Sequence, residues 1–299
     1  MALSNFDCRK LSSNWISRSI SLLLFFVLLA ATARAQADRK SQHETIQFKS
    51  ELVGKVLPYD TLLPPGYDKS NRRYPVLYLL HGLFGRHDDW ITRTNLAEYA
   101  AQYDLIIITP EGHDSWYVDS ATVPQDKYET YLVRELIPEV DSRYRTIKDR
   151  RARGIAGLSM GGYGALKFGF KYRDYFVFAG SMSGALDPAN RTEDHPGFAW
   201  DILRSSLVSA FGAAGSQTRQ NNDLHQIARS ASGVNTLPYL YLDCGLEDGW
   251  LTTNREFAEI LIAKKIRHQY RQLPGTHNWE YWDRQLREVL RVYANLTVR

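Results

Sequence analysis

Short runs of consecutive apolar residues constrain the fold of this 299-residue chain more than any other feature. The runs are apolar at nearly every position, which is typical of strands covered on both faces and not of strands with one face in water. Six such strands are predicted, at residues 74–80, 105–109, 154–158, 176–179, 239–242 and 269–273. A weaker alternation over residues 41–57 predicts one or two edge strands before them.

Apolar residues at helical spacing predict helices between these strands. Helices are expected over 127–144, around 257–261, and over about 279–293 with Asn278 as the N-cap. Strands that alternate with helices favour a mostly parallel central sheet with helices on both faces, which is an α/β fold. Such a sheet places functional groups at the carboxyl ends of its strands.

The segment 186–238 interrupts this alternation and is rich in Asn, Arg, Ser, Gly and His. It contains helical pieces near 198–208 and 224–231. We interpret the segment as a small cap insertion over the site and not as a separate domain. Residues 36–299 are therefore predicted to form a single domain.

The first 35 residues have the three parts of an export signal. Arg9, Lys10 and Arg18 supply positive charge, residues 20–31 are apolar, and Ala-Arg-Ala at 33–35 matches a cleavage site. The apolar run is shorter than the roughly 20 residues of a membrane-spanning helix, so a signal peptide is favoured over a membrane anchor. We predict a secreted or periplasmic mature chain with no stable membrane insertion.

Charge and cysteine content argue against several classes of partner and cofactor. The formal net charge is +4, and four basic residues against one acidic residue place +3 of it in the first 35 residues. No basic stripe is present, so no nucleic-acid partner is expected. No His or carboxylate cluster has metal-ligand spacing, and neither a metal nor a cofactor is expected. Cys8 falls in the predicted signal, which leaves Cys244 alone and excludes an internal disulfide in the mature chain.

The pentapeptide Gly-Leu-Ser-Met-Gly at 157–161 has the clearest chemical meaning in the chain. It follows the predicted strand 154–158 and precedes a helical stretch that runs to Tyr172. In that context Gly-x-Ser-x-Gly forms a sharp strand-to-helix turn that holds the serine hydroxyl clear of the backbone. The helix N-terminus also favours negative charge that develops at a reacting carbonyl. Ser159 is therefore the predicted nucleophile, and the alternative is a serine in a structural turn.

A serine nucleophile requires a histidine base and an acid that orients it, and after this turn they follow in the order acid, then histidine. His277 lies in a loop between the last strand and the final helix, and it is the predicted base. The other histidines after the serine lie in the insertion or begin a strand: His195, His225 and His268. Asp248, in the loop beyond strand 239–242, is the preferred acid. Asp243 and Glu247 remain alternatives.

An oxyanion hole requires two backbone N–H groups beside the nucleophile. Met160 supplies one because it directly follows the serine, and Leu83, in the loop after the first buried strand, is expected to supply the other. His81 is expected to brace that loop rather than to react. Trp116 and Tyr117 follow another strand end and are predicted to line the substrate pocket, with the alternative that both are core aromatics.

Several blocks of sequence, in order, resemble the esterase D and antigen 85-like family of α/β-hydrolases. The blocks are 81–85, 89–90, 115–117, 128–129, 157–162, 243–248 and 277–282. The resemblance runs from about Leu57 to the C-terminus and implies the α/β-hydrolase fold. It also implies a catalytic triad and two oxyanion donors at the positions chosen above, namely Ser159, Asp248 and His277, with Leu83 and Met160.

The family includes tributyrin-type acyl esterases, S-formylglutathione hydrolases, feruloyl and acetylxylan esterases, and mycolyltransferases. The chain looks most similar to the tributyrin-type esterases. The resemblance implies an exported serine carboxylesterase that hydrolyses small acyl esters through an acyl-enzyme intermediate. A feruloyl or acetylxylan esterase that acts on esters of plant polysaccharides is the main alternative. An S-formylglutathione hydrolase, an acyltransferase and a non-catalytic secreted binding protein are less favoured.

Overall fold

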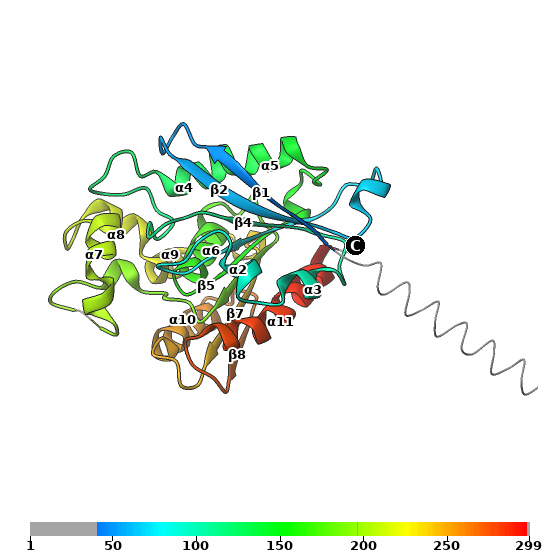
Figure 1. Cartoon of the computed structure of the whole chain (residues 1–299). Coiled ribbons are helices and arrows are strands. Elements are labelled where there is room, and N and C mark those ends of the chain that lie inside the picture. The colour runs from blue at the N-terminus through cyan, green and yellow to red at the C-terminus, as the bar shows by residue number, and fades with distance from the viewer. Residues whose placement is uncertain (1–40, 196, 298–299) are drawn as a thin grey trace, which may run out of the picture. The chain divides into compact units, whose positions relative to one another are not determined.

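Eight strands form one sheet in a computed structural model that describes residues 41–195 and 197–297; the predicted export signal lies outside them (Figure 1). The strand order is β1-β2-β4-β3-β5-β6-β7-β8, in which β3 to β8 are parallel and β1 and β2 are antiparallel to their neighbours. The strands are β1 (Gln42–Lys49), β2 (Val56–Leu63), β3 (Val76–Leu80), β4 (Ile106–Pro110), β5 (Arg153–Leu158), β6 (Phe178–Met182), β7 (Tyr239–Gly245) and β8 (His268–Leu273). The predicted mostly parallel sheet is confirmed.

Helices lie on both faces of this sheet. The α-helices in the described residues are α2 (Asp89–Thr92), α3 (Leu96–Ala100), α4 (Tyr128–Tyr131), α5 (Ile137–Arg143), α6 (Met160–Lys171), α7 (Trp200–Phe211), α8 (Gln217–Asn222), α9 (Leu224–Ser230), α10 (Leu251–Ala263) and α11 (Trp279–Thr297). Short turns of other helix types are η1 (Tyr67–Lys69), η2 (Leu132–Leu136), η3 (Arg150–Ala152), η4 (Pro188–Asn190) and η5 (Val234–Thr236). Within the described residues, no helix is both long and apolar enough to cross a membrane.

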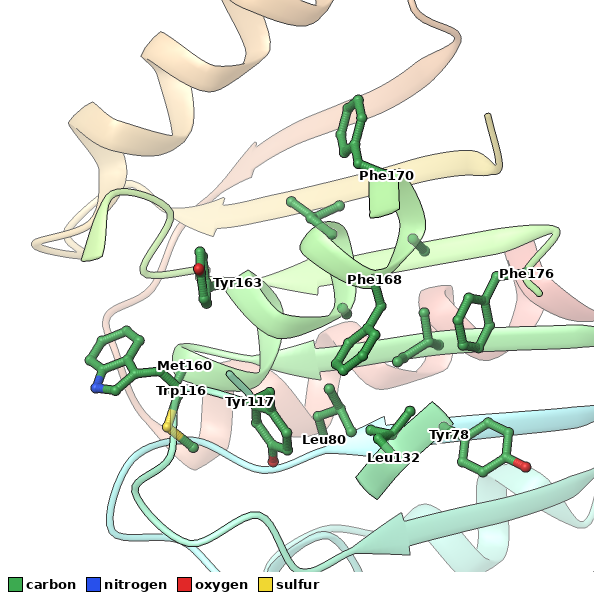
Figure 2. Close-up of a cluster of buried hydrophobic side chains, with 14 of the residues drawn as sticks. Tyr78, Leu80, Trp116, Tyr117, Leu132, Met160, Tyr163, Phe168, Phe170 and Phe176 are labelled. Carbon is green, nitrogen blue, oxygen red and sulfur yellow. The ribbon is translucent and has the colours of Figure 1, made fainter. Parts of the chain in front are cut away.

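Two hydrophobic cores, one on each face, explain why the central strands β3 and β4 are apolar at nearly every position. Tyr78 and Leu80 of β3 belong to the core that also contains Phe168 of α6 (Figure 2). Leu77 and Leu79 of the same strand belong to the opposite core, which is built largely with α3 and α11. Because side chains alternate across a strand, a strand buried on both faces needs an apolar residue at each step.

Three elements differ from the sequence prediction. The edge strands are predicted within 41–57, but β2 runs over Val56–Leu63 and pairs with both β1 and β4, so only β1 lies at this edge. The helix predicted over 127–144 is α4 and α5 joined by the π-helical segment η2. Pro138 lies at the start of α5 and has no N–H to donate to the preceding turn, which favours a local change of hydrogen bonding there. The strand predicted at 176–179 lies at Phe178–Met182 instead. Gly180 and Ser181 resemble turn residues in sequence, but both are buried in this strand.

The insertion shares the larger core with the rest of the sheet. Leu203, Leu207 and Phe211 of α7 belong to the same cluster as β3 and α6. Arg219 of α8 is buried, and its guanidinium donates to the backbone carbonyl oxygens of Ala189 and Gly212, each at 3.0 Å. A buried arginine needs several acceptors to offset its loss of hydration. These bonds therefore tie the segments of the insertion to one another.

Candidate active site

Ser159 lies in a tight turn between β5 and α6. Its backbone has φ 51° and ψ −118°, a conformation that residues with a side chain rarely adopt and that costs on the order of 1–3 kcal/mol. Its N–H donates to the carbonyl oxygen of Met182 at 3.0 Å, and its own carbonyl oxygen accepts from the N–H groups of Tyr163 and Ala185. Hydrogen bonds on both sides therefore hold the strained turn in place.

The two glycines of the pentapeptide allow this turn to form. A Cβ atom on Gly157 would lie 2.5 Å from the carbonyl group of Gly161, and a Cβ atom on Gly161 would lie 2.5 Å from the backbone oxygens of Leu80 and His81. No larger residue fits at either position without moving backbone atoms. The close approach also brings β3 and the loop after it against the serine turn.

The strain at Ser159 leads to a testable expectation about stability. Both Ser159→Gly and Ser159→Ala remove the hydroxyl, but only glycine adopts this backbone conformation without a penalty. We expect the glycine variant to be the more stable by up to about 1 kcal/mol, which corresponds to roughly 2 °C in melting temperature for a domain of this size. Thermal unfolding of the two variants measures the difference. An alanine variant that melts at the higher temperature would show that the turn is not strained.

His277 and Asp248 complete a chain of hydrogen bonds that starts at the serine. The distance from Ser159 Oγ to His277 Nε2 is 3.0 Å, and that from His277 Nδ1 to Asp248 Oδ2 is 2.9 Å. The three residues come from loops at the carboxyl ends of β5, β8 and β7. Because a carboxylate accepts only, Asp248 fixes the proton on Nδ1 and leaves Nε2 free to take a proton from the serine.

The surroundings of Asp248 keep its carboxyl group ionised. Burial alone would raise the pKa of this group, but hydrogen bonds from His277 and from the Trp250 N–H at 2.9 Å lower the pKa below its usual value. The His277 ring is also packed edge-on against Trp282, with ring centroids 4.9 Å apart. Sequence reasoning did not select Trp282, although it falls one helical turn after the histidine loop.

The other two candidate acids contact different groups. Glu247 accepts a hydrogen bond from the N–H of Gly275 at 2.6 Å and so braces the loop that carries His277. Asp243 is fully buried and accepts from the hydroxyl of Tyr281 at 2.9 Å. Of the three carboxylates, Asp248 is the one that the structure places against the imidazole.

Asp243 gives a second expectation, about the dependence of stability on pH. Burial raises the pKa of Asp243 to about 7, whereas an aspartate in an unfolded chain titrates near 3.9. Between these values the folded state binds more protons than the unfolded state, so this group lowers the stability as the pH rises. We expect Asp243→Asn to gain stability relative to the parent between pH 5 and pH 8. Melting curves of both proteins at pH 5 and pH 8 measure the gain. If the difference in melting temperature between variant and parent were the same at the two pH values, the raised pKa of Asp243 would be contradicted.

The two predicted oxyanion donors border the serine turn. Met160 is the first residue of α6, and Leu83 follows Gly82, whose Cα lies so near the serine that an added Cβ would be 3.3 Å from Ser159 Cβ. Neither N–H has a hydrogen-bond acceptor among the described residues. The N–H of the next residue, Phe84, donates to Asp114 Oδ1 at 2.7 Å. Their action as a pair on a substrate oxygen stays a prediction.

Trp116 and Tyr117, predicted to line the pocket, are each 1% exposed. The indole of Trp116 packs against Tyr163 (Figure 2) and against Phe211. The Tyr117 hydroxyl donates to the carbonyl oxygen of His81 at 3.1 Å. These contacts favour the alternative stated from sequence, that both are core aromatics. Trp116 belongs to the loop after β4, and its contacts hold this loop against α6 and α7.

A cleft of about 520 Å³ lies between α7 and the loops that follow β3 and β4. Phe84, Tyr128 and Ile202 give it apolar surface, and five serines give it hydroxyl groups: Ser115, Ser120, Ser205, Ser206 and Ser209. A further insertion residue, Phe198, packs edge-on against Trp250, two residues beyond Asp248. No group of metal-binding side chains is present in the described part of the chain.

Comparison with known proteins identifies the family. The sequence profile of the putative esterase family matches residues 50–293. The chain belongs to this esterase family. The resemblance to the esterase D and antigen 85-like group and the predicted α/β-hydrolase fold are thereby confirmed.

Individual members of the esterase family show how far the similarity extends. Esterase MT1326 of Mycobacterium tuberculosis (strain CDC 1551 / Oshkosh) is 32% identical over 255 residues, which are 77% of this chain and 54% of that protein. The chain thus spans about half the length of this relative. Acetyl esterase of Caldicellulosiruptor saccharolyticus is 26% identical over 260 residues, 81% of this chain and 94% of that protein. A solved structure of a ferulic acid esterase has a TM-score of 0.71 and 27% identity, covering 86% of this chain and 99% of that one.

Proposed function

We propose that the chain is an exported serine carboxylesterase in which Ser159, His277 and Asp248 form the catalytic triad. The observation that carries the proposal is the chain of hydrogen bonds from Ser159 Oγ through His277 to Asp248, which begins at a strained turn in a member of an esterase family. A structural turn would have no need for an imidazole and a buried carboxylate in line with the hydroxyl.

The first half-reaction forms an ester on the enzyme. Ser159 Oγ attacks the carbonyl carbon of the substrate while its proton passes to His277 Nε2, and Asp248 stabilises the imidazolium. The carbonyl oxygen becomes an oxyanion that accepts hydrogen bonds from the N–H groups of Leu83 and Met160. His277 then gives the proton to the leaving alcohol oxygen. The alcohol departs and the acyl group remains on the serine.

The second half-reaction returns the enzyme to its starting state. A water molecule takes the place of the alcohol, and His277 removes its proton as it attacks the acyl-enzyme carbonyl. The same oxyanion donors stabilise the second tetrahedral intermediate. When it collapses, the proton returns to Ser159 Oγ and the carboxylic acid leaves.

Two substrate classes are proposed for this site. The first is a small acyl ester. The second is an acetyl or feruloyl ester on a polysaccharide. Two observations favour this second class: the cleft whose lining includes Phe84, the residue after Leu83, is rich in serine hydroxyls, and the similar proteins include an acetyl esterase and a ferulic acid esterase. Hydroxyl groups that line a cleft are suited to hydrogen bonding with a sugar.

Rates on a panel of esters test the activity and separate the two substrate classes. The panel contains 4-nitrophenyl esters from C2 to C12, methyl ferulate and acetylxylan, with Ser159→Ala as the control for each. A preference for the short 4-nitrophenyl esters supports the small-ester assignment. A higher kcat/KM on methyl ferulate or acetylxylan supports the polysaccharide assignment, and no activity above the control on any ester would end the proposal.

Export forms a separate part of the proposal. We propose that residues 1–35 are removed and that residues 36–299 form a single mature domain. N-terminal sequencing of the protein recovered outside the cytoplasm tests this, with Gln36 expected as the first residue. Full-length chain retained in the cytoplasm would contradict it.

A further inference from the structure

A second buried carboxylate, Glu111, lies beneath the loop that carries Leu83. Glu111 directly follows β4 and is buried. Its Oε1 accepts a hydrogen bond from the N–H of His113 at 2.8 Å, and its Oε2 accepts one from the N–H of His87 at 3.3 Å. A single side chain thus joins the loop after β4 to the end of the loop after β3.

Three imidazoles surround this carboxylate. His81 Nε2 and His113 Nδ1 are each 3.3 Å from Oε1, and His87 Nδ1 is 3.5 Å from Oε2. Its ion-pairing neighbours in the described residues are therefore histidines and not lysine or arginine. Burial alone would raise the pKa of Glu111, but its contacts with His87 and with the backbone N–H of His113 lower the pKa well below its usual range. A buried carboxylate that stays ionised needs hydrogen-bond donors, and the backbone N–H groups of His87 and His113 supply them.

The link from Glu111 to the active site passes through His81. The bond from Glu111 to the His113 N–H closes a turn in which the N–H of Gly112 points to His81 Nε2, at 2.9 Å. Since Nε2 accepts this bond, the ring proton is on Nδ1, which donates to the carbonyl oxygen of Gly82 at 2.7 Å. The imidazole is thus held at both nitrogens.

The geometry of the peptide bond carries this restraint to the donor. The carbonyl of Gly82 and the N–H of Leu83 belong to one planar trans peptide unit, so they point in opposite directions. A carbonyl held by His81 on one side therefore sets the direction of the Leu83 N–H on the other. The N–H of Gly85 also donates to this carbonyl, at 3.1 Å, and adds a second restraint.

We propose that Glu111 is a positioning residue for the oxyanion hole: it holds the turn that presents Gly112 to His81, and through His81 it orients the Leu83 N–H. The inference rests on the proposed function, because it assigns Glu111 to a donor that acts only in that reaction. Glu111 itself does not touch the substrate. Its loss should therefore affect the oxyanion and leave the binding of the neutral ester nearly unchanged.

The test replaces Glu111 by glutamine, which keeps the shape but lacks the charge and one acceptor. We expect kcat for 4-nitrophenyl acetate to fall about 10- to 100-fold with KM within about threefold, because a misdirected donor weakens transition-state binding. The inhibition constant of a trifluoromethyl ketone, which forms a tetrahedral oxyanion on the serine, should rise by the same factor as kcat/KM falls. A variant that merely loses stability would not show this matched change.

Glu135→Gln is the matched control. The carboxylate of Glu135 also accepts backbone N–H groups of a loop, those of Glu51 and Leu52 at 3.0 and 3.1 Å, but that loop joins β1 to β2. Its kcat should stay within about twofold of the parent. Glu111→Asp is the second variant if the glutamine variant does not fold, and it should show the same selective loss of kcat to a smaller extent.

The outcomes separate this inference from the proposed function. A folded Glu111 variant with the kcat of the parent, or with an unchanged inhibition constant for the ketone, would overturn the role of Glu111 alone. A loss of kcat as large in Glu135→Gln would overturn it too. A parent protein without activity that depends on Ser159 would instead overturn the proposed function.

Discussion

We expect Ser159→Ala and His277→Ala each to lower kcat for ester hydrolysis by roughly 10⁶-fold. The reason is that the serine hydroxyl is a weak nucleophile without the imidazole, and the imidazole, 3.0 Å away, has no reaction to assist without the hydroxyl. The double variant should therefore be no slower than either single variant. Steady-state rates on 4-nitrophenyl acetate with the three proteins measure this.

Two histidines that sequence reasoning also considered serve as controls. His195 is exposed in the insertion, and His268 begins β8, where its Nδ1 contacts the carbonyl oxygen of Ile266. His195→Ala and His268→Ala should keep kcat within about threefold of the parent. If the fold-losses of kcat in Ser159→Ala and His277→Ala multiplied in the double variant, the serine and the histidine would act independently. That result would contradict a shared catalytic role.

We expect Asp248→Asn to lower kcat by about 10⁴-fold, the size of effect seen when the acid of such a triad is made neutral. In the parent protein, the carboxylate of Asp248 accepts the Nδ1 proton of His277 at 2.9 Å. An amide NH₂ in that place would favour the other tautomer, in which Nε2 carries the proton and cannot take one from Ser159. The KM should change little, because Asp248 is buried behind the imidazole.

The neighbouring carboxylates provide the controls for this change. Glu247→Gln weakens one bond to the Gly275 N–H and should cost less than about tenfold in kcat. Asp243→Asn should stay within about threefold, because Asp243 contacts Tyr281 and not the imidazole. A larger loss in either control than in Asp248→Asn would move the acid to that residue.

Much of the architecture follows from features that sequence displays directly. Strands buried on both faces need apolar residues throughout, so β3 and β4 stand out as continuous runs. The serine turn stands out for a similar reason, since Gly157 and Gly161 are required by contacts that no larger residue could make. N-capping is equally local: Asn278 Oδ1 accepts the Tyr281 N–H at 2.9 Å, as expected from its place before α11.

Features that depend on packing between distant segments could not be predicted from sequence. Asp243, Glu247 and Asp248 lie within six residues, and only the placement of the loop against β8 decides which one meets His277. Trp116 and Tyr117 are apolar and follow a strand end, but their burial depends on α6 and α7. Sequence alone also gives no sign that Glu111 would meet three histidines, since His81 and His87 precede it by a whole strand and its connection.

Covalent labelling with a fluorophosphonate tests the central claim most directly, because this reagent reacts with a hydroxyl only where a base activates it and oxyanion donors receive the new charge. Intact mass and peptide mapping should show one equivalent of label, located on Ser159. The rate of labelling should fall by at least about 10³-fold in His277→Ala and stay at the parent level in His268→Ala. Label on another residue, or labelling of Ser159 at the same rate without His277, would contradict the account.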